Sequence, residues 1–330
     1  MTNPNQPRRS LGDIHMRDPF LLTLPDNTYR LYGTTDPNPW VGPGTGFDAY
    51  RSDDLENWDG PHSVFKADPQ FSGSTQFWAP EVHPWNDAWY MFATFADSAG
   101  HRGTHVLRAG TPDGPFQPIS QSPITPPDWM CLDGTLFVDD TGTPWLVFCR
   151  EWLEVTVGQI WAVALTDDLR ERIGDPVLLF RANEAPWTVP LSLTESNGLS
   201  DGAYVTDGPF LYRTPEALIM LWSSRSRTGY AVGVARATGG LMSGPWEHDI
   251  APIWDLDGGH AMIGRMPEGG ELLVLHAPNN SPFERPQLLP LTFARGTFAV
   301  SQSRPFQVGR KTPTFSHNLT TAVDPANDIL

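Results

Sequence analysis

The sequence predicts an all-β fold, a five-bladed β-propeller, and three observations support it. Glycine (30 residues) and proline (33 residues) are so frequent in a chain of 330 residues that long helices are disfavoured. Aromatic residues make up 11% of the chain and include 13 tryptophans, which is not the composition of a disordered protein. A two-strand pattern also recurs five times, which is typical of propeller blades.

Each repeat begins with a short apolar strand that carries one acid or histidine. A second strand, rich in aromatic and β-branched residues, follows about ten residues later, in keeping with the turn spacing of all-β folds. First strands are expected at residues 17–22, 78–82, 132–137, 206–211 and 259–263, and second strands at 29–32, 89–92, 145–148, 218–221 and 272–275. Third strands are expected at residues 47–50, 104–107, 160–163 and 230–233. The alternative is a β-sandwich whose strands have this spacing by coincidence.

The repeats run through nearly the whole chain and therefore predict one domain. We expect an N-terminal tail at residues 1–12, a single propeller at 13–310 and a C-terminal tail at 311–330. Each repeat is long enough for a four-stranded antiparallel unit with variable loops.

Charge and hydropathy exclude several classes of partner. The net charge is −16 and the only lysines are Lys66 and Lys311, so no basic surface for nucleic acid is expected. No stretch of about 18 apolar residues would span a membrane. No apolar segment follows Arg8 and Arg9, so a secretory signal is not expected and the location is predicted to be cytoplasmic, unless a signal was trimmed.

The two cysteines, Cys131 and Cys149, flank a predicted hairpin whose centre lies near residue 140. A disulfide between them is geometrically conceivable. Two buried thiols are the expectation for a cytoplasmic protein, and the sequence leaves the choice open.

The acid or histidine of each repeat is a candidate functional residue. Inner strands of a propeller line its central channel, so these five side chains are expected to converge: Asp18, Glu81, Asp133, Asp207 and His260. Charged groups on apolar strands are costly to bury without a function. Paired carboxylates across a concave site suit glycoside hydrolysis, in which one acts as a base and the other as an acid. A metal centre is the alternative use of such residues.

The chain resembles glycoside hydrolase family 43, a family of five-bladed β-propellers, over roughly residues 13–300. The resemblance rests on the order and spacing of six short motifs, at residues 17–20, 52–58, 77–81, 132–135, 207–212 and 258–260. It implies inverting hydrolysis of glycosides, commonly of arabinofuranose or xylose residues, with an oligosaccharide as the substrate and no organic cofactor.

The resemblance also implies catalytic roles. Asp18 matches the general base, and Asp133 matches the acid that orients the general acid and tunes its pKa. Asp207 stands where the family usually has a glutamate as general acid, and its side chain is one methylene shorter. Glu184, in the segment 183–187, is the alternative acid. Glu81 is interpreted as a structural acid that lines the channel.

Further residues are expected to bind substrate or an ion. His260 matches an axial histidine that often holds Ca²⁺ or another cation through waters. Trp78 matches an aromatic residue that stacks on the sugar, although tryptophan is also common in cores. Arg285 and His276 are candidate donors to sugar hydroxyls, with a surface ion pair as the alternative. His15 is expected at the rim of the site.

Function is therefore predicted as an exo-acting or side-chain-removing glycosidase, an α-L-arabinofuranosidase first and a β-xylosidase second. A catalytically inactive sugar-binding propeller is the alternative that the missing glutamate favours. A propeller that binds only proteins would not explain the converging acids. The sugar, its linkage, exo or endo action and the oligomeric state stay open.

Overall fold

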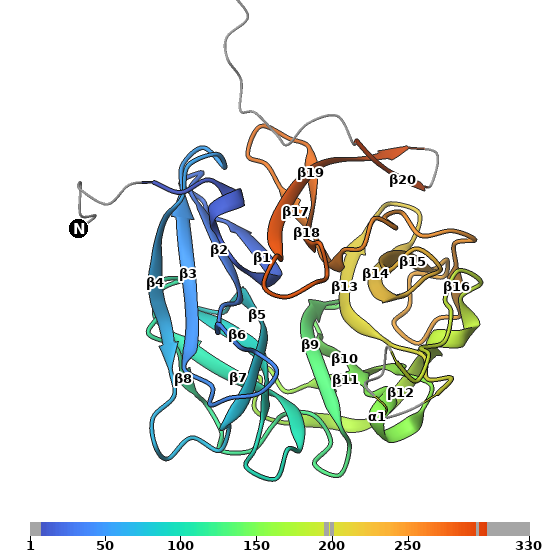
Figure 1. Ribbon diagram of the computed structural model, residues 1–330, viewed down its shortest axis with the longest axis horizontal. Coiled ribbons are helices and arrows are strands. Elements are labelled where there is room, and N and C mark those ends of the chain that lie inside the picture. The colour runs from blue at the N-terminus through green and yellow to red at the C-terminus, as the bar shows by residue number, and fades with distance from the viewer. Residues whose placement is uncertain (1–7, 195–197, 199–200, 295–296, 302–330) are drawn as a thin grey trace, which may run out of the picture.

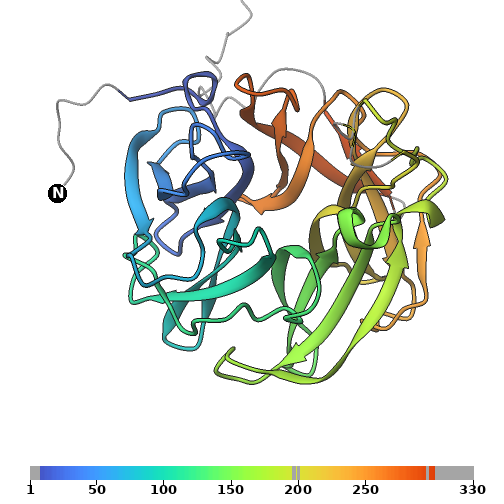
Figure 2. The same cartoon turned by 60° about the horizontal axis from the view of Figure 1, so that its bottom comes forward.

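A computed structural model describes residues 8–194, 198, 201–294 and 297–301. Five four-stranded antiparallel sheets are arranged as blades around a common centre, which confirms the predicted all-β propeller (Figure 1). The view turned by 60° shows the twisted sheets packed around that centre (Figure 2). The described residues contain no helix long and apolar enough to cross a membrane.

Every sheet is built from four strands that are consecutive in the sequence. The first two sheets contain β1 (Arg17–Thr23), β2 (Tyr29–Thr34), β3 (Gly46–Ser52) and β4 (Asp59–Lys66), then β5 (Thr75–Trp85), β6 (Ala88–Ala96), β7 (Arg102–Ala109) and β8 (Gln117–Pro118). The third contains β9 (Cys131–Val138), β10 (Pro144–Arg150), β11 (Gln159–Leu165) and β12 (Arg172–Arg181). The last two contain β13 (Asp207–Arg213), β14 (Leu218–Arg225), β15 (Tyr230–Ala237) and β16 (Trp246–His248), then β17 (Gly259–Arg265), β18 (Glu271–Ala277), β19 (Arg285–Ala294) and β20 (Thr297–Val300).

Helical structure in the described residues is limited to single turns: α1 (Trp152–Val155), η1 (Leu11–Asp13) and η2 (Ala182–Glu184). The predicted N-terminal tail already contacts the first sheet at residues 8 and 9: Arg8 pairs with Asp53, and Arg9 and Trp58 exchange backbone hydrogen bonds. The predicted domain boundary at residue 310 and the C-terminal tail at 311–330 lie outside the described residues.

Apolar side chains fill the spaces between neighbouring sheets. Between the first and second sheets, four buried phenylalanines contact one another edge to face or tilted: Phe47, Phe65, Phe77 and Phe95. The same interdigitation recurs around the ring, since the four apolar clusters each join residues from adjacent sheets. Because each sheet packs on both neighbours, the inner strands are held at fixed positions around the centre.

Each inner strand carries a residue with positive φ at an equivalent β-bulge, and this position defines the repeat. The five residues, with φ between 48° and 55°, are Asp18, Ala79, Asp133, Gly208 and His260. The register shifts directly after each of them, in β1, β5, β9, β13 and β17. We call them the left-handed positions.

Two of the five candidate residues, Glu81 and Asp207, do not occupy the left-handed position of their strand. Glu81 lies two residues after Ala79, and Asp207 lies one residue before Gly208. A shift of one residue along a strand turns a side chain to the other face. Asp207 is therefore the structural counterpart of Arg17 and Trp78, and it is not the counterpart of Asp18.

Cys131 and Cys149 are both buried and free. They are offset in the hairpin, because Cys149 pairs with Leu132 and Cys131 pairs with Arg150. Successive residues of a strand point to opposite faces, so this offset keeps the two thiols apart.

Candidate active site

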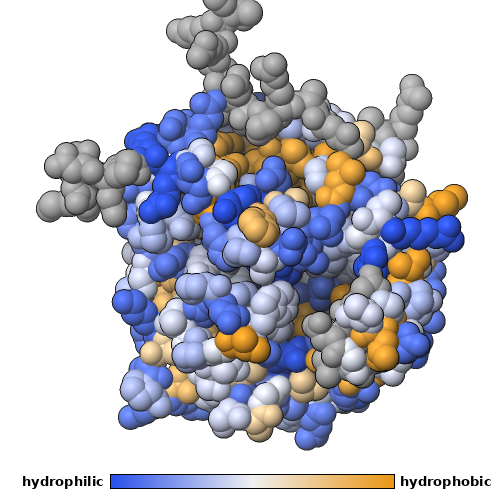
Figure 3. All heavy atoms as spheres, in the orientation of Figure 1, coloured by the Kyte–Doolittle hydropathy of each residue, from blue (hydrophilic) through white to orange (hydrophobic). Residues whose placement is uncertain are grey.

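A cavity of about 720 Å³ opens where the inner strands of the five sheets meet. Residues directly before the left-handed positions line it: Arg17, Trp78, Leu132 and Asp207. Three left-handed residues also reach it: Asp18, Asp133 and His260. In the space-filling view, hydrophilic residues gather around a hollow near the centre of the ring (Figure 3).

Side chains of the second strands hold the left-handed positions in place. The backbone N–H of each such residue donates to a side chain of the preceding sheet: Ala79 to Thr34 (2.8 Å), Asp133 to Thr94 (2.8 Å), His260 to Ser223 (2.8 Å) and Asp18 to His276 (3.1 Å). The fifth left-handed residue, Gly208, differs because the equivalent second-strand residue of the preceding sheet is Cys149. Its N–H donates to Asp133 Oδ2 instead, at 3.0 Å. These bonds satisfy the donors that the bulges release from the sheet ladder.

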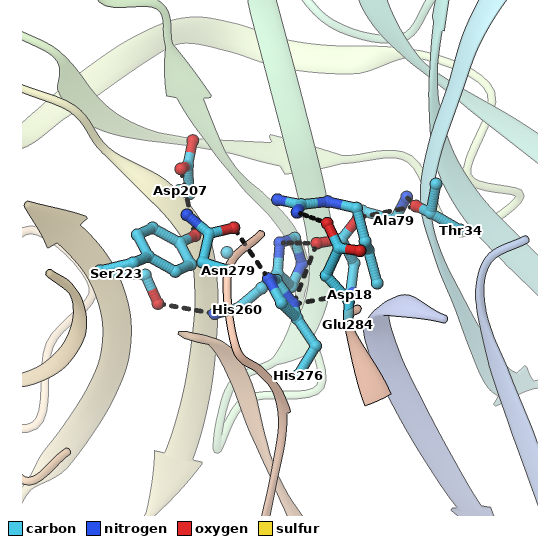
Figure 4. A network of polar contacts seen from close by, with 12 residues as sticks. Asp18, Thr34, Ala79, Asp207, Ser223, His260, His276, Asn279 and Glu284 are labelled. Carbon is cyan, nitrogen blue, oxygen red and sulfur yellow. Dashed lines mark hydrogen bonds and ion pairs between the residues drawn. The ribbon is translucent and has the colours of Figure 1, made fainter. Parts of the chain in front are cut away.

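Asp18 is buried and surrounded by groups that favour its ionised form. Thr34 Oγ1 donates to Asp18 Oδ2 at 2.6 Å, and His260 Nδ1 lies 3.3 Å from Asp18 Oδ1 (Figure 4). Burial alone would raise the pKa of this carboxyl, but His260, Arg17 and the Thr34 hydroxyl together hold it below its ordinary value. Asp18 is therefore an ionised carboxylate at neutral pH, as a general base must be.

His276 supports Asp18 from beneath and does not line the cavity. Its Nδ1 accepts the Asp18 N–H, and its Nε2 lies 3.2 Å from Asn279 Oδ1, so the ring is neutral with its proton on Nε2 (Figure 4). Burial and the nearby Arg17 lower the pKa of His276 to about 3. The structure places this histidine against the backbone of Asp18, whereas the sequence suggested a donor to sugar hydroxyls.

Asp133 faces both Asp18 and the next sheet. Its Oδ2 accepts the Gly208 N–H and lies 3.6 Å from His260 Nδ1. Burial, and then the negative charge of Asp18, raise the pKa of Asp133 well above its ordinary value. The close approach needs glycine at 208, because φ is +49° and a Cβ there would lie 2.8 Å from the His260 ring.

Asp207 projects into the cavity from the start of β13 and has one hydrogen-bond donor from β15. Tyr230 Oη donates to Asp207 Oδ2 at 3.1 Å. Burial, and then the charge of Asp133, raise the pKa of Asp207 to about 7. The Tyr230 ring stands over Gly259, where a Cβ would lie 2.3 Å from Tyr230 Cε1. A carboxyl whose pKa is near 7 carries a proton that it can donate at neutral pH.

Trp78 lies on the cavity wall as expected, and its neighbours limit how it can contact a sugar. Arg102 Cζ lies 5.2 Å from the ring centroid, so a cation covers one face of the indole. Trp78 Nε1 donates to Pro39 O at 2.7 Å, and Trp40 meets the ring edge to face at a centroid distance of 5.3 Å. Trp40 is 46% exposed and extends this aromatic wall.

Besides His276, four predicted residues lie outside the lining of the cavity. Glu184 is exposed at the end of η2 and its Oε1 accepts the Arg181 N–H at 3.1 Å. His15 Nε2 lies 3.3 Å from Glu284 Oε2, and Arg285 donates to the carbonyls of Gly12 and Pro282. Glu81 is also outside it, buried where Thr135 and His83 contact its carboxylate.

The sequence missed several residues that line the cavity: Arg17, Trp40, Arg102, Glu151 and Tyr230. Two of these residues could have been found from the predicted strands. Arg17 lies one residue before Asp18, and Tyr230 begins a predicted third strand. Arg102 and Glu151 come from strand ends with no recurring motif, so only the folded ring brings them to the site.

The expected cation beside His260 stays a prediction. No group of three or more metal-ligating side chains in the described part of the chain is arranged to hold an ion directly. His260 Nδ1 faces two carboxylates, at 3.3 Å from Asp18 Oδ1 and 3.6 Å from Asp133 Oδ2. These residues do not form a direct coordination set, so an ion there would be held through waters.

Comparisons with known proteins agree with this geometry. The family model described as glycosyl hydrolases family 43 matches residues 11–294. An endo-arabinase structure from Bacteroides thetaiotaomicron is 38% identical and has a TM-score of 0.81, covering 89% of this chain and 100% of its own. A thermostable family-43 glycoside hydrolase is 25% identical (TM-score 0.74, 94% and 97% covered).

A third structure, an endo-1,4-beta-xylanase from Bacteroides thetaiotaomicron, shares the fold at 24% identity (TM-score 0.70, 89% and 96% covered). A comparison with curated protein sequences finds no match. The family model spans all five inner strands together with Asp18, Asp133 and Asp207. The chain belongs to glycosyl hydrolases family 43 and is a glycoside hydrolase.

Proposed function

We propose that this glycoside hydrolase inverts the anomeric centre of arabinofuranosyl linkages, with Asp18 as general base and Asp207 as general acid. The proposal rests on two carboxyl groups that line one cavity and whose pKa values are shifted in opposite directions. The pKa of Asp18 is lowered, and that of Asp207 is raised to about 7. Two carboxyl groups with these properties on either side of a sugar match the requirements of glycoside hydrolysis.

In the proposed reaction, Asp18 accepts a proton from a water molecule as the water attacks the anomeric carbon. Asp207 donates its proton to the departing glycosidic oxygen as that bond breaks. Burial keeps Asp207 protonated, and Asp133, which contacts neither the water nor the leaving oxygen in this scheme, adds to that effect. The Asp18 and Asp207 carboxyls are expected about 6.5–9.5 Å apart, which leaves room for the water.

Arabinose is favoured as the sugar because the 38% identical structure is named an endo-arabinase. That name also makes endo-cleavage of arabinan chains the second candidate, beside the exo-acting arabinofuranosidase that the sequence suggested. Xylosidase activity is the third, supported only by neighbours that share the fold at lower identity. The products from 1,5-linked arabino-oligosaccharides distinguish the first two, since endo action yields oligomers and exo action yields the monomer.

The experiment that tests the proposal is Asp18→Asn, assayed on arabino-oligosaccharides and xylo-oligosaccharides. An amide cannot accept the proton of water, so kcat should fall by at least about 10²–10⁴-fold. The melting temperature should change little, since the amide still accepts the Thr34 hydrogen bond. Near-normal turnover in this variant would remove Asp18 from the base position. NMR of the first product should show the inverted anomer, and a retained anomer would exclude the single-displacement scheme.

A further inference from the structure

We propose that Arg102 and Glu151 form a hydroxyl-binding pair that recognises one neutral sugar residue of the substrate. The inference rests on the proposed function and deepens it, because it assigns substrate recognition to two residues outside the catalytic carboxyls. Arg102 begins β7, and Glu151 lies between β10 and α1. Both line the cavity, although they are far apart in the sequence.

The pair is buried and incompletely satisfied. Arg102 is 7% exposed and Glu151 is 5% exposed. Arg102 Nη1 donates to Glu151 Oε1. Arg102 Nε and Glu151 Oε2 have no hydrogen-bond partner among the residues that the structure describes. Buried polar atoms of native proteins are rarely left without a partner, because the cost of removing them from water is then not recovered.

The pKa of Glu151 points to the same deficit. Burial raises the pKa of Glu151 even though Arg102 opposes that shift. One ion pair therefore does not compensate the carboxylate for its loss of water. A second donor, aimed at Oε2 from the cavity, would supply the missing stabilisation.

Two hydroxyls of one sugar meet both needs, since one can accept from Arg102 Nε and the other can donate to Glu151 Oε2. The ion pair has no net charge, so it suits a neutral sugar better than the charged carboxylate of a uronic acid. Apolar surface for the C–H face of the sugar lies nearby, because Trp78, Trp152 and Leu153 line the same cavity.

A nearby ion pair of the same composition provides a matched control. Arg150 and Glu154 contact each other in an i,i+4 pair, and Glu154 also accepts the Met130 N–H at 2.9 Å. Neither residue lines the cavity. Glu154→Gln therefore makes the same chemical change as Glu151→Gln at a position that cannot contact substrate.

The test measures the dissociation constant of neutral arabino-oligosaccharides and xylo-oligosaccharides by calorimetry. Asp18→Asn is used as the parent so that binding is recorded without turnover. Glu151→Gln and Arg102→Lys should each weaken the binding of the preferred sugar by about 10- to 100-fold, the value of a hydrogen bond to a charged group. Glu154→Gln should bind like the parent. Parental affinity in Glu151→Gln, or an equal loss in Glu154→Gln, would overturn the inference.

Singly deoxygenated sugars keep the inference testable if the substitutions prevent folding. With the Asp18→Asn parent, removal of one particular hydroxyl should weaken binding tenfold or more, and equal affinity for all the deoxy sugars would overturn the pair. The proposed function has a separate readout, which is turnover by the unmodified chain. Binding without release of sugar would contradict catalysis and leave recognition supported. A chain that binds none of these neutral sugars would contradict the recognition pair.

Discussion

Asp18, Asp133 and Asp207 are the same residue type in one cavity, and their neighbours make them chemically different. Asp18 receives the Thr34 hydroxyl and faces His260, so its pKa falls. Burial and then the charge of Asp133 raise the pKa of Asp207 to about 7, and the Tyr230 hydroxyl only partly opposes them. The proposed division into base and acid therefore follows from burial, hydrogen bonds and charge and does not depend on side-chain length.

Tyr230→Phe tests how Asp207 is positioned. The hydroxyl stabilises the ionised form of Asp207, so its removal should raise the pKa of Asp207 further above 7. The alkaline limb of kcat/KM against pH, which reports the acid of the free enzyme, should move to higher pH. The maximum should fall by about tenfold or less, the value of one hydrogen bond.

The control for that experiment is Tyr50→Phe, which removes a hydroxyl from a buried tyrosine of β3 outside the cavity. Its pH profile should match that of the parent. An unmoved alkaline limb in Tyr230→Phe would show that Tyr230 does not contact the catalytic acid.

At the scale of the strand, the left-handed bulge converts one sequence pattern into two rows of side chains. One row consists of the left-handed residues, such as Asp18 and His260, and the other consists of the residues just before them, such as Arg17 and Asp207. Composition and the repeat were enough to predict the five sheets and the inner strands. They could not predict the rows, because an acid before or at the bulge looks the same in a sequence.

Asp207 shows why the position of an acid relative to the bulge matters. The sequence alone favoured Asp207 as the acid and left Glu184 as the alternative, because reach could be judged only from side-chain length. In the fold, Asp207 stands on the cavity wall and Glu184 is exposed on η2. Arg102 and Glu151 were not predictable, since they meet only when the second and third sheets pack together.

Gly208→Ala tests whether the bulge positions the catalytic groups. An added Cβ would lie 2.8 Å from the His260 ring at a φ of +49°, so both strain and a steric clash are introduced. We expect a stability loss of about 1–3 kcal/mol by chemical denaturation and a fall in kcat of at least tenfold. Gly142→Ala is the matched control, because Gly142 also has positive φ but a Cβ there meets nothing within 4 Å. It should lose stability through strain alone and keep full kcat, and equal activity in the two variants would contradict the account.

At the scale of the molecule, the ring must join its first and last sheets without sharing a strand between them. The join is made at the active site, where Arg17 Nη1 donates to Glu284 Oε1 at 2.6 Å and His276 accepts the Asp18 N–H. Thr23 Oγ1 also donates to the Arg265 carbonyl at 2.6 Å. Closure of the propeller and placement of the proposed base therefore depend on the same contacts.

Glu284→Gln tests the closure. Burial would raise the pKa of Glu284, but the Ser281 hydroxyl and Arg17 lower it to about 2. Because the folded pKa is depressed, this carboxylate contributes stability that is present above about pH 4.5 and is lost as the pH falls toward 2. The variant should lose about 3–5 kcal/mol at pH 7, as expected for a broken buried ion pair, and its stability should fall less steeply below pH 4.5.

Asp53→Asn is the control for closure, since the Arg8–Asp53 pair is exposed and should contribute little. Denaturant titrations from pH 2 to 7 provide the measurement. Equal stability of Glu284→Gln and the parent across this range would show that the ring closes by packing alone.

Asp207→Ala shows whether Asp207 protonates the leaving group, because the activity of this variant should then depend on the quality of the leaving group. Natural disaccharides have poor leaving groups, so kcat/KM on them should fall by about 10²–10⁴-fold. Aryl glycosides with good leaving groups need little protonation and should be affected much less, while Glu184→Ala should leave both substrates unchanged. The account is contradicted if Asp207→Ala slows both substrates equally, or if the dependence appears in Glu184→Ala instead.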